Sequence, residues 1–200
     1  GHQTLDANTT GIRNTAVGED SLGSNTTSSY STAVGYRALR QNTTGASNVA
    51  VGAQALDANV TGASNTAVGR SCLQNNTASN NTAIGDRALY VNTTGSQNTA
   101  VGKQSLQANT TGDQNVAVGA NISSDWNTAV GYAALTDNTS GQQNTALGRM
   151  TLANNTTGDG NVAIGMNALD ANTTADNNTA VGKDALGANT TGASNTALGK

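Results

Sequence analysis

The sequence predicts an all-β fold, a parallel β-solenoid of about twelve 17-residue coils. A pentapeptide, Asn-Thr-Ala-Val-Gly or a close variant, recurs along all 200 residues. Successive copies begin 17 residues apart, except for one interval of 16 and one interval of 12. The pentapeptide resumes after each, so one period governs the chain. The copies begin at Asn14, Ser31, Asn48, Asn65, Asn81, Asn98, Asn115, Asn127, Asn144, Asn161, Asn178 and Asn195.

The composition supports the same fold class. The chain has no Phe and only 10% charged residues, so a globular core of ordinary size is not expected. Its formal net charge is only -3, and its apolar residues recur in register, which favours an ordered stack over a disordered chain. The absence of Pro fits a backbone whose N–H groups are nearly all needed for hydrogen bonds between coils.

Each coil is predicted to contain two short strands. The Thr-Ala-Val stretch, residues 15–17 in the first copy, alternates and is bounded by Asn and Gly. The segment around Leu22, residues 20–24, is a second candidate. No helix is expected, because a Gly and an Asn-Thr-Thr-Gly turn recur too often for a helix to nucleate. Stacked coils would lie about 4.8 Å apart, giving a rod roughly 55 Å long.

Each repeat position forms a column along the stack, and its residue type predicts its surroundings. The Ala16 column never varies, so a neighbour is expected to pack too closely for a larger side chain. The Gly18 column suits a tight turn with positive φ. The Leu22 column is expected to be buried. The columns of Asn14 and Asn8 are expected to form hydrogen-bonded amide ladders.

The alternation of side chains along the strand leaves two arrangements open. Thr15 and Val17 point one way and Ala16 the other. If Thr and Val face inward with Leu, the Ala face is outside and flat. If Ala faces inward, an outward stripe of Val needs cover from another chain. Both arrangements predict an oligomer.

We interpret residues 1–200 as a single continuous solenoid array, with a shortened coil at residues 119–131. Both ends are in phase with the repeat and neither resembles a cap, whereas terminal repeats of solenoids normally depart from consensus. We therefore expect the array to be a window of a longer fibre.

The sequence predicts no enzyme activity and no catalytic, cofactor-binding or metal site. His2 is the only His, so neither a Ser-His-Asp arrangement nor a multi-histidine metal site can form within one chain. Cys72, the one Cys, stands in a column shared with Ala38 and Ala55, which predicts a small buried residue, with a reactive thiol as the alternative. The scattered Asp residues are interpreted as solvated surface charge, and they include Asp20, Asp113, Asp137, Asp159 and Asp170.

The Asn-Thr-Thr turns are also N-glycosylation sequons. Neighbours in this column would lie about 4.8 Å apart, too close for a glycan on every coil, which favours an unmodified Asn ladder over a glycosylated one. The sequons include Asn8, Asn25, Asn42, Asn92, Asn109, Asn155, Asn172 and Asn189.

Trp126, the only Trp, lies in the shortened coil. A shortened coil predicts a notch, where an aromatic ring could bind a sugar or a partner; alternatively, Trp126 covers the gap. The Tyr residues are predicted to be too dispersed for an aromatic platform, and they are Tyr30, Tyr36, Tyr90 and Tyr132.

The pentapeptides "NVAVG" at Asn48 and Asn115 and "NVAIG" at Asn161 resemble the repeats of trimeric autotransporter adhesin heads. The full repeat unit also resembles repeats in the shafts of phage tail-fibre-like proteins. The resemblance covers the whole chain and implies a left-handed parallel β-roll wound as a trimer.

These observations predict a structural extracellular fibre, filament or shaft segment, on a cell-surface appendage or virion, that rigidly displays an adhesive tip. Its expected partners are further copies of itself, as a homotrimer or a head-to-tail filament, with a cell-surface glycan or protein receptor as a further possibility. The alternatives are an adhesin that binds through its own rod surface and an ice-binding β-solenoid. The acidic balance gives no basic surface for nucleic acid, and no apolar run approaches the ~20 residues of a membrane span.

Overall fold

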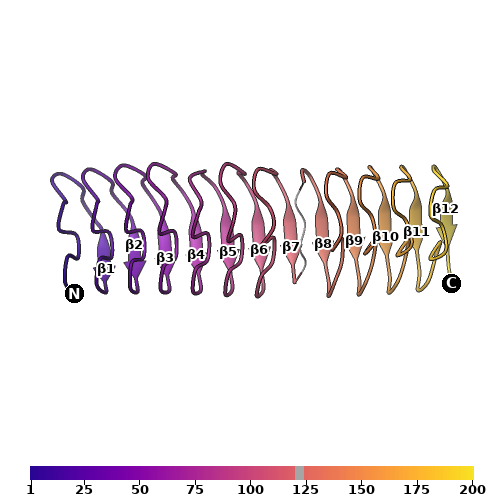
Figure 1. Cartoon of the computed structure of the whole chain (residues 1–200), viewed down its shortest axis with the longest axis horizontal. Helices are drawn as coiled ribbons and strands as arrows, with labels where there is room; N and C mark the ends of the chain where they lie inside the picture. The colour runs from indigo at the N-terminus through magenta and orange to yellow at the C-terminus, as the bar shows by residue number, and fades with distance from the viewer. Residues whose placement is uncertain (120–123) are drawn as a thin grey trace. The chain divides into compact units, whose positions relative to one another are not determined.

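The computed structural model describes residues 1–119 and 124–200, which form two compact units, Gly1–Thr111 and Gly112–Lys200. Each unit is described by itself. The regular elements of the described residues are three-residue strands (Figure 1). Unit 1 holds β1 (Thr15–Val17), β2 (Thr32–Val34), β3 (Val49–Val51), β4 (Thr66–Val68), β5 (Thr82–Ile84) and β6 (Thr99–Val101). Unit 2 holds β7 (Val116–Val118), β8 (Thr128–Val130), β9 (Thr145–Leu147), β10 (Val162–Ile164), β11 (Thr179–Val181) and β12 (Thr196–Leu198).

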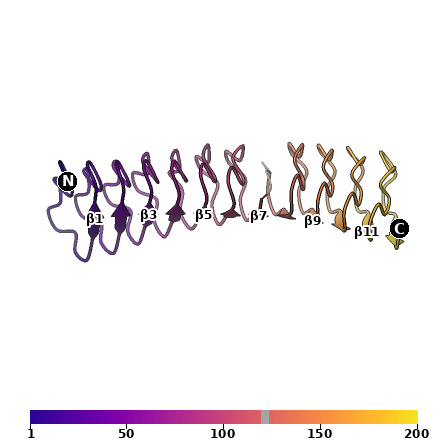
Figure 2. The same ribbon diagram turned by 90° about the horizontal axis from the view of Figure 1, so that it is seen from below.

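Within each unit, neighbouring strands pair in parallel and in register. In unit 1, Ala33 of β2 pairs with Ala16 on one side and Ala50 on the other. In unit 2, Ala117 and Ala129 stay paired although their repeats begin only 12 residues apart. One strand per repeat occupies one side of each coil, and turns close the rest (Figure 2). The predicted parallel β-solenoid, with about 17 residues per coil, is confirmed.

The second predicted strand of each coil is wrong, because the Ala-Leu segment forms consecutive turns. In the coil of β1, the N–H groups of Gly23 and Asn25 donate to the carbonyls three residues earlier, at 3.2 and 3.1 Å. These bonds close four-residue turns. The N–H group of Ser24, between them, donates to the carbonyl of Arg40 in the next coil at 3.0 Å. The backbone thus alternates between closing its own turns and bonding the next coil.

These turns place Leu residues in a left-handed conformation, with φ of 49° at Leu22 and 52° at Leu56. A non-Gly residue there costs roughly 1–2 kcal/mol. Both Leu side chains are fully buried, and burial of a Leu side chain contributes about 1.5–3 kcal/mol. Burial of the Leu side chain therefore offsets the free-energy cost of the left-handed backbone conformation that its turn requires.

The Gly that follows β3 is required for two reasons. Gly52 has a φ of 138°, a conformation that side chains with a Cβ rarely adopt. A Cβ added there would also lie 2.4 Å from the carbonyl oxygen of Gly69 in the next coil. The predicted positive φ is confirmed, and close stacking of the coils adds a second constraint.

The interior of each unit consists of Ala and Leu columns together with buried Asn. In the coil of β3, Ala50 and Leu56 are fully buried, whereas Val51 is 37% exposed. The strand burial patterns repeat this alternation in both units. Ala therefore faces inward, and Thr and Val face outward, which decides between the two predicted arrangements. The predictions of a closely packed Ala column and a buried Leu column are confirmed.

We expect Leu56→Ala to lower the free energy of unfolding by about 2–5 kcal/mol, because a fully buried Leu leaves a cavity. Val51→Ala in the same coil should cost no more than about 1 kcal/mol, because that side chain is partly solvated. Equilibrium denaturation of both variants measures the difference. Equal losses would contradict the assignment of inward and outward faces.

Candidate functional surface

The Asn before each strand fastens its coil to the next. In unit 2, Asn144 Oδ1 accepts the N–H of Asn161 at 2.9 Å, and its Nδ2 donates to the carbonyl of Gly158 at 2.8 Å. Asn65 makes the corresponding pair of bonds in unit 1, at 2.9 and 2.8 Å. Both Asn side chains are fully buried. One primary amide supplies the acceptor and the donor together, which explains why Asn recurs here.

The Asn of the Asn-Thr-Thr turn forms the predicted amide-to-amide ladder. In unit 1, Asn25 Nδ2 donates to Asn8 Oδ1 at 2.7 Å, and in unit 2, Asn155 Nδ2 donates to Asn138 Oδ1 at 3.0 Å. Asn155 Nδ2 also donates to the carbonyl of Gly158, at 3.0 Å. Asn25 and Asn155 are fully buried. Their burial supports the unmodified ladder over the glycosylated turn.

A third ladder was not predicted from the sequence. It stands two positions before the strand Asn, where Asp159 Oδ1 accepts the N–H of Gln142 at 2.7 Å and Asp176 Oδ1 accepts the N–H of Asp159 at 2.8 Å. Ser79 Oγ does the same for Ala63 in unit 1, at 3.0 Å. Asp159 therefore acts as a backbone acceptor, beyond the solvated charge predicted for it. The signal in the sequence is the preference for short polar residues at this position.

The outward side chains of the strands form what we call the Thr–Val face, and we use the name for each unit separately. Its apolar members are partly exposed, for example 37% at Val51 in unit 1 and 46% at Leu147 in unit 2. The hydroxyls of strand residues such as Thr32 and Thr128 make no hydrogen bond within the described chain. Turn residues such as Thr26 differ, since its Oγ1 donates to the carbonyl of the next coil at 3.1 Å. The face thus carries free hydroxyls beside methyl groups.

Exposed aromatic side chains stand at the ends of two strands. Tyr30 and Tyr36 flank β2 in unit 1, 54% and 42% exposed, and Trp126 and Tyr132 flank β8 in unit 2, 48% and 73% exposed. Trp126 is thus a partly exposed side chain. The predicted notch at residues 119–131 includes residues 120–123, which lie outside the described residues.

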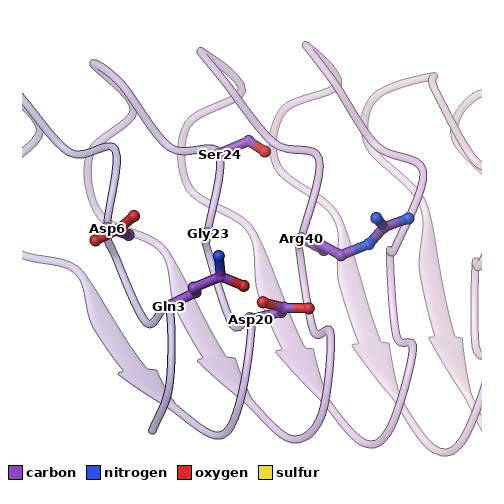
Figure 3. A pocket seen from close by; sticks show the side chains of 6 residues that line it. All are labelled: Gln3, Asp6, Asp20, Gly23, Ser24 and Arg40. Atoms are coloured by element: carbon purple, nitrogen blue, oxygen red, sulfur yellow. The ribbon is translucent and has the colours of Figure 1, made fainter.

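A polar hollow of about 230 Å³ lies on unit 1, where Gly23 interrupts a column of longer side chains (Figure 3). It is lined by Gln3, Asp6, Asp20, Gly23, Ser24 and Arg40. Arg40 extends away from it to Asp57, with Nε 2.7 Å from Oδ1. This hydrogen bond raises the pKa of the Arg40 guanidinium. The hollow is thus the space that a longer side chain would fill at the Gly23 position, among charged side chains of the neighbouring coils.

The remaining candidates for chemistry lie apart from one another. His2 is exposed, and Asp20 lies 3.6 Å from the guanidinium of Arg37. Over residues 1–119 and 124–200, no three His, Cys, Asp or Glu side chains group as metal ligands would. The same residues contain no helix long and apolar enough to cross a membrane.

Cys72 is a buried residue of the unit 1 interior, as predicted. Its side chain is fully buried, and Sγ donates to the carbonyl of Ala83 at 3.1 Å. Burial raises the pKa of the Cys72 thiol to about 12. Since the thiolate is the reactive form, this site disfavours the alternative of a reactive thiol.

Comparisons with protein-family models, with curated proteins and with solved structures found no match to this chain. The resemblance to adhesin heads and tail-fibre shafts therefore stays a prediction.

We expect Asn144→Ala to lower the free energy of unfolding by about 1–3 kcal/mol, because it leaves the buried N–H of Asn161 without a partner and removes one of the two donors to the Gly158 carbonyl. Asn154→Ala is the matched control, since Asn154 is exposed and its side chain makes one hydrogen bond, to the carbonyl of Asp170, and it should cost less than about 1 kcal/mol. Chemical denaturation measures both. Similar values for the two variants would show that the buried amide does not fasten the coils.

Cys72→Ala tests the buried thiol. An unfolded chain ionises its thiol above about pH 8.5, whereas the folded chain holds the proton up to a pKa of about 12. Unfolding therefore releases a proton in this window, and the Cys72 contribution to stability falls as pH rises through it. The difference in free energy of unfolding between the native chain and Cys72→Ala should accordingly shift in favour of the variant between neutral pH and about pH 10. A difference that stays constant with pH would contradict a buried, protonated thiol.

Proposed function

We propose that this chain is a structural segment of an extracellular fibre, a shaft that holds an adhesive tip away from the surface of a cell or virion. One observation carries the proposal: the residues that recur in most repeats are used to stack each coil on its neighbour. Asn144 holds two backbone groups of the next coil, Leu56 fills the interior, and Gly52 permits close backbone approach. The repeat is thus organised for stacking.

Stacking of this kind suits a stiff shaft. Each coil bonds its neighbours through a strand, through turn backbone such as Ser24 to Arg40, and through side-chain ladders such as Asn155 to Asn138. Bending would have to break bonds on several sides of the coil at once. Repeat proteins of this type gain length by adding units that contact only their neighbours.

The number of chains in the shaft is part of the proposal. The Ala and Leu interior closes within a single chain, since Ala50 and Leu56 are fully buried in it. The Thr–Val face is the apolar surface that further copies would contact in a homotrimer. A head-to-tail filament would use the stacking edges of the strands instead.

Ice binding is the weaker alternative, although the free hydroxyls of the Thr–Val face favour it. The outer strand position carries Val51, Ile84 and Leu147, which differ in length. Val also replaces Thr at the first strand position of β3 and β7. Such a face lacks the even surface that adsorption to an ice crystal requires.

Insertion of whole repeats tests the shaft. A second copy of residues 14–64, placed after Ser64, keeps the repeat in phase and adds three coils. The longest dimension of the particle should increase by roughly 14 Å while its cross-section stays constant. Small-angle X-ray scattering measures both quantities, and light scattering gives the number of chains.

The control is an insert of the same composition in scrambled order, which should loop out without lengthening the particle. An in-phase insert that widened the particle, or that left its length unchanged, would overturn the shaft proposal. A mass of one chain per particle would contradict the homotrimer but not the shaft.

A further inference from the structure

The aromatic residues of this chain are placed in a repeated pattern. Four of the five flank a strand at both ends, in the segments "YSTAVGY" at residues 30–36 and "WNTAVGY" at residues 126–132. The first segment contains β2 and the second contains β8. Three of the four Tyr residues, predicted to be dispersed, thus belong with Trp126 to two aromatic pairs, each across one strand.

The segment around β8 presents a row of outward side chains. Trp126 and Tyr132 are 48% and 73% exposed, and Thr128 and Val130 between them are partly exposed. Asn127 and Ala129, which alternate with them, are fully buried. We call Trp126, Thr128, Val130 and Tyr132 the β8 row. The chain between the two rings is not fully extended, since φ is 54° at Trp126 and 136° at Gly131, so their Cα atoms lie less than the ~20 Å apart that six residues of extended chain would span.

Trp126 is held in place before any ligand arrives. Its φ is 54°, and its backbone N–H donates to the carbonyl of Asp113 at 3.0 Å. The indole Nε1 also donates to Gln114 Oε1. A ring that is already oriented loses less conformational entropy on binding.

The β8 row is chemically suited to an uncharged sugar chain. Residues 126–132 contain no charged side chain. The rings offer flat apolar faces with polar edges, and the hydroxyl of Thr128 lies between them without a partner in the described chain. Gln143 occupies the position of Trp126 in the next coil and adds an amide. We propose that the β8 row binds an uncharged polysaccharide, whose sugar rings stack on Trp126 and Tyr132.

The corresponding β2 row, which consists of Tyr30, Thr32, Val34 and Tyr36, provides an internal comparison. The guanidinium of Arg13 lies 5.2 Å from the centre of the Tyr30 ring, and that of Arg37 lies 4.9 Å from the centre of the Tyr36 ring. A cation at this distance occupies a face of the ring. The β2 row therefore offers less free aromatic surface to an uncharged ligand, and the β8 row is the stronger site.

The experiment uses Trp126 as its own reporter, since it is the only Trp in the sequence. The 200-residue chain is titrated with cellohexaose, with chitohexaose and with an alginate oligosaccharide, and the Trp emission is followed. We expect a saturable change with at least one of the two uncharged oligosaccharides and a much weaker response to alginate.

Tyr132→Ala should weaken that binding about tenfold, the loss of one aromatic contact. Tyr36→Ala, the matched change in the β2 row, should alter it less than about twofold. Both residues are exposed, and thermal melting confirms that the variants fold. Trp126→Ala, followed by calorimetry, should also weaken binding.

Two results would overturn the proposal. One is the absence of any response to both uncharged oligosaccharides at their solubility limits. The other is a change in Trp emission that is reduced equally by Tyr132→Ala and by Tyr36→Ala, or that is larger with alginate than with the uncharged oligosaccharides. None of these results bears on the shaft, which the in-phase insertion tests separately.

Discussion

The structure depends on one constraint: coils stacked about 4.8 Å apart must satisfy nearly all of their backbone polar groups in the neighbouring coils. Each coil has only three residues in a strand, so the strand ladder alone serves a small part of the backbone. The turns supply a second set of bonds, in which Leu22 and Ser24 reach the next coil while Gly23 and Asn25 close turns. Buried backbone groups left without a partner would each cost about 1–3 kcal/mol, which is why the repeat tolerates so little variation.

Side chains bond those backbone N–H and carbonyl groups that find no partner in another backbone group. The amide of Asn144 takes the place of a peptide group, accepting from one backbone N–H and donating to one carbonyl of the next coil. Gly52 allows the backbones to approach more closely than a Cβ would permit. Outward side chains are not needed to satisfy backbone groups or to permit close stacking. The aromatic pairs around β2 and β8 occupy such outward positions. The columns thus hold the fold, whereas departures from the repeat supply the surface on which recognition can be built.

The period of the sequence was sufficient to predict the solenoid, the buried Leu column, the turn at Gly and the amide ladder at Asn8 and Asn25. It was not sufficient for the Ala-Leu segment, because a short apolar stretch bounded by polar residues fits both a strand and turns that place Leu22 in a left-handed conformation. The direction in which Ala16 faces could not be predicted either, since both directions alternate equally. The placement of Trp126 and Tyr132 at the two ends of β8 follows only once the bounds of that strand are known.

Amide hydrogen exchange tests the central claim most directly, that Asn side chains extend the bonding between coils beyond the strands. The N–H of Thr145 donates to the backbone carbonyl of Asn161 at 2.8 Å. The N–H of Asn144, one residue earlier and outside β9, donates to the side-chain Oδ1 of Asn127 at 3.0 Å. If the side-chain bond is part of the stack, the two amides exchange at similar, slow rates and open together. Rapid exchange of the Asn144 amide beside a protected Thr145 amide would contradict the account.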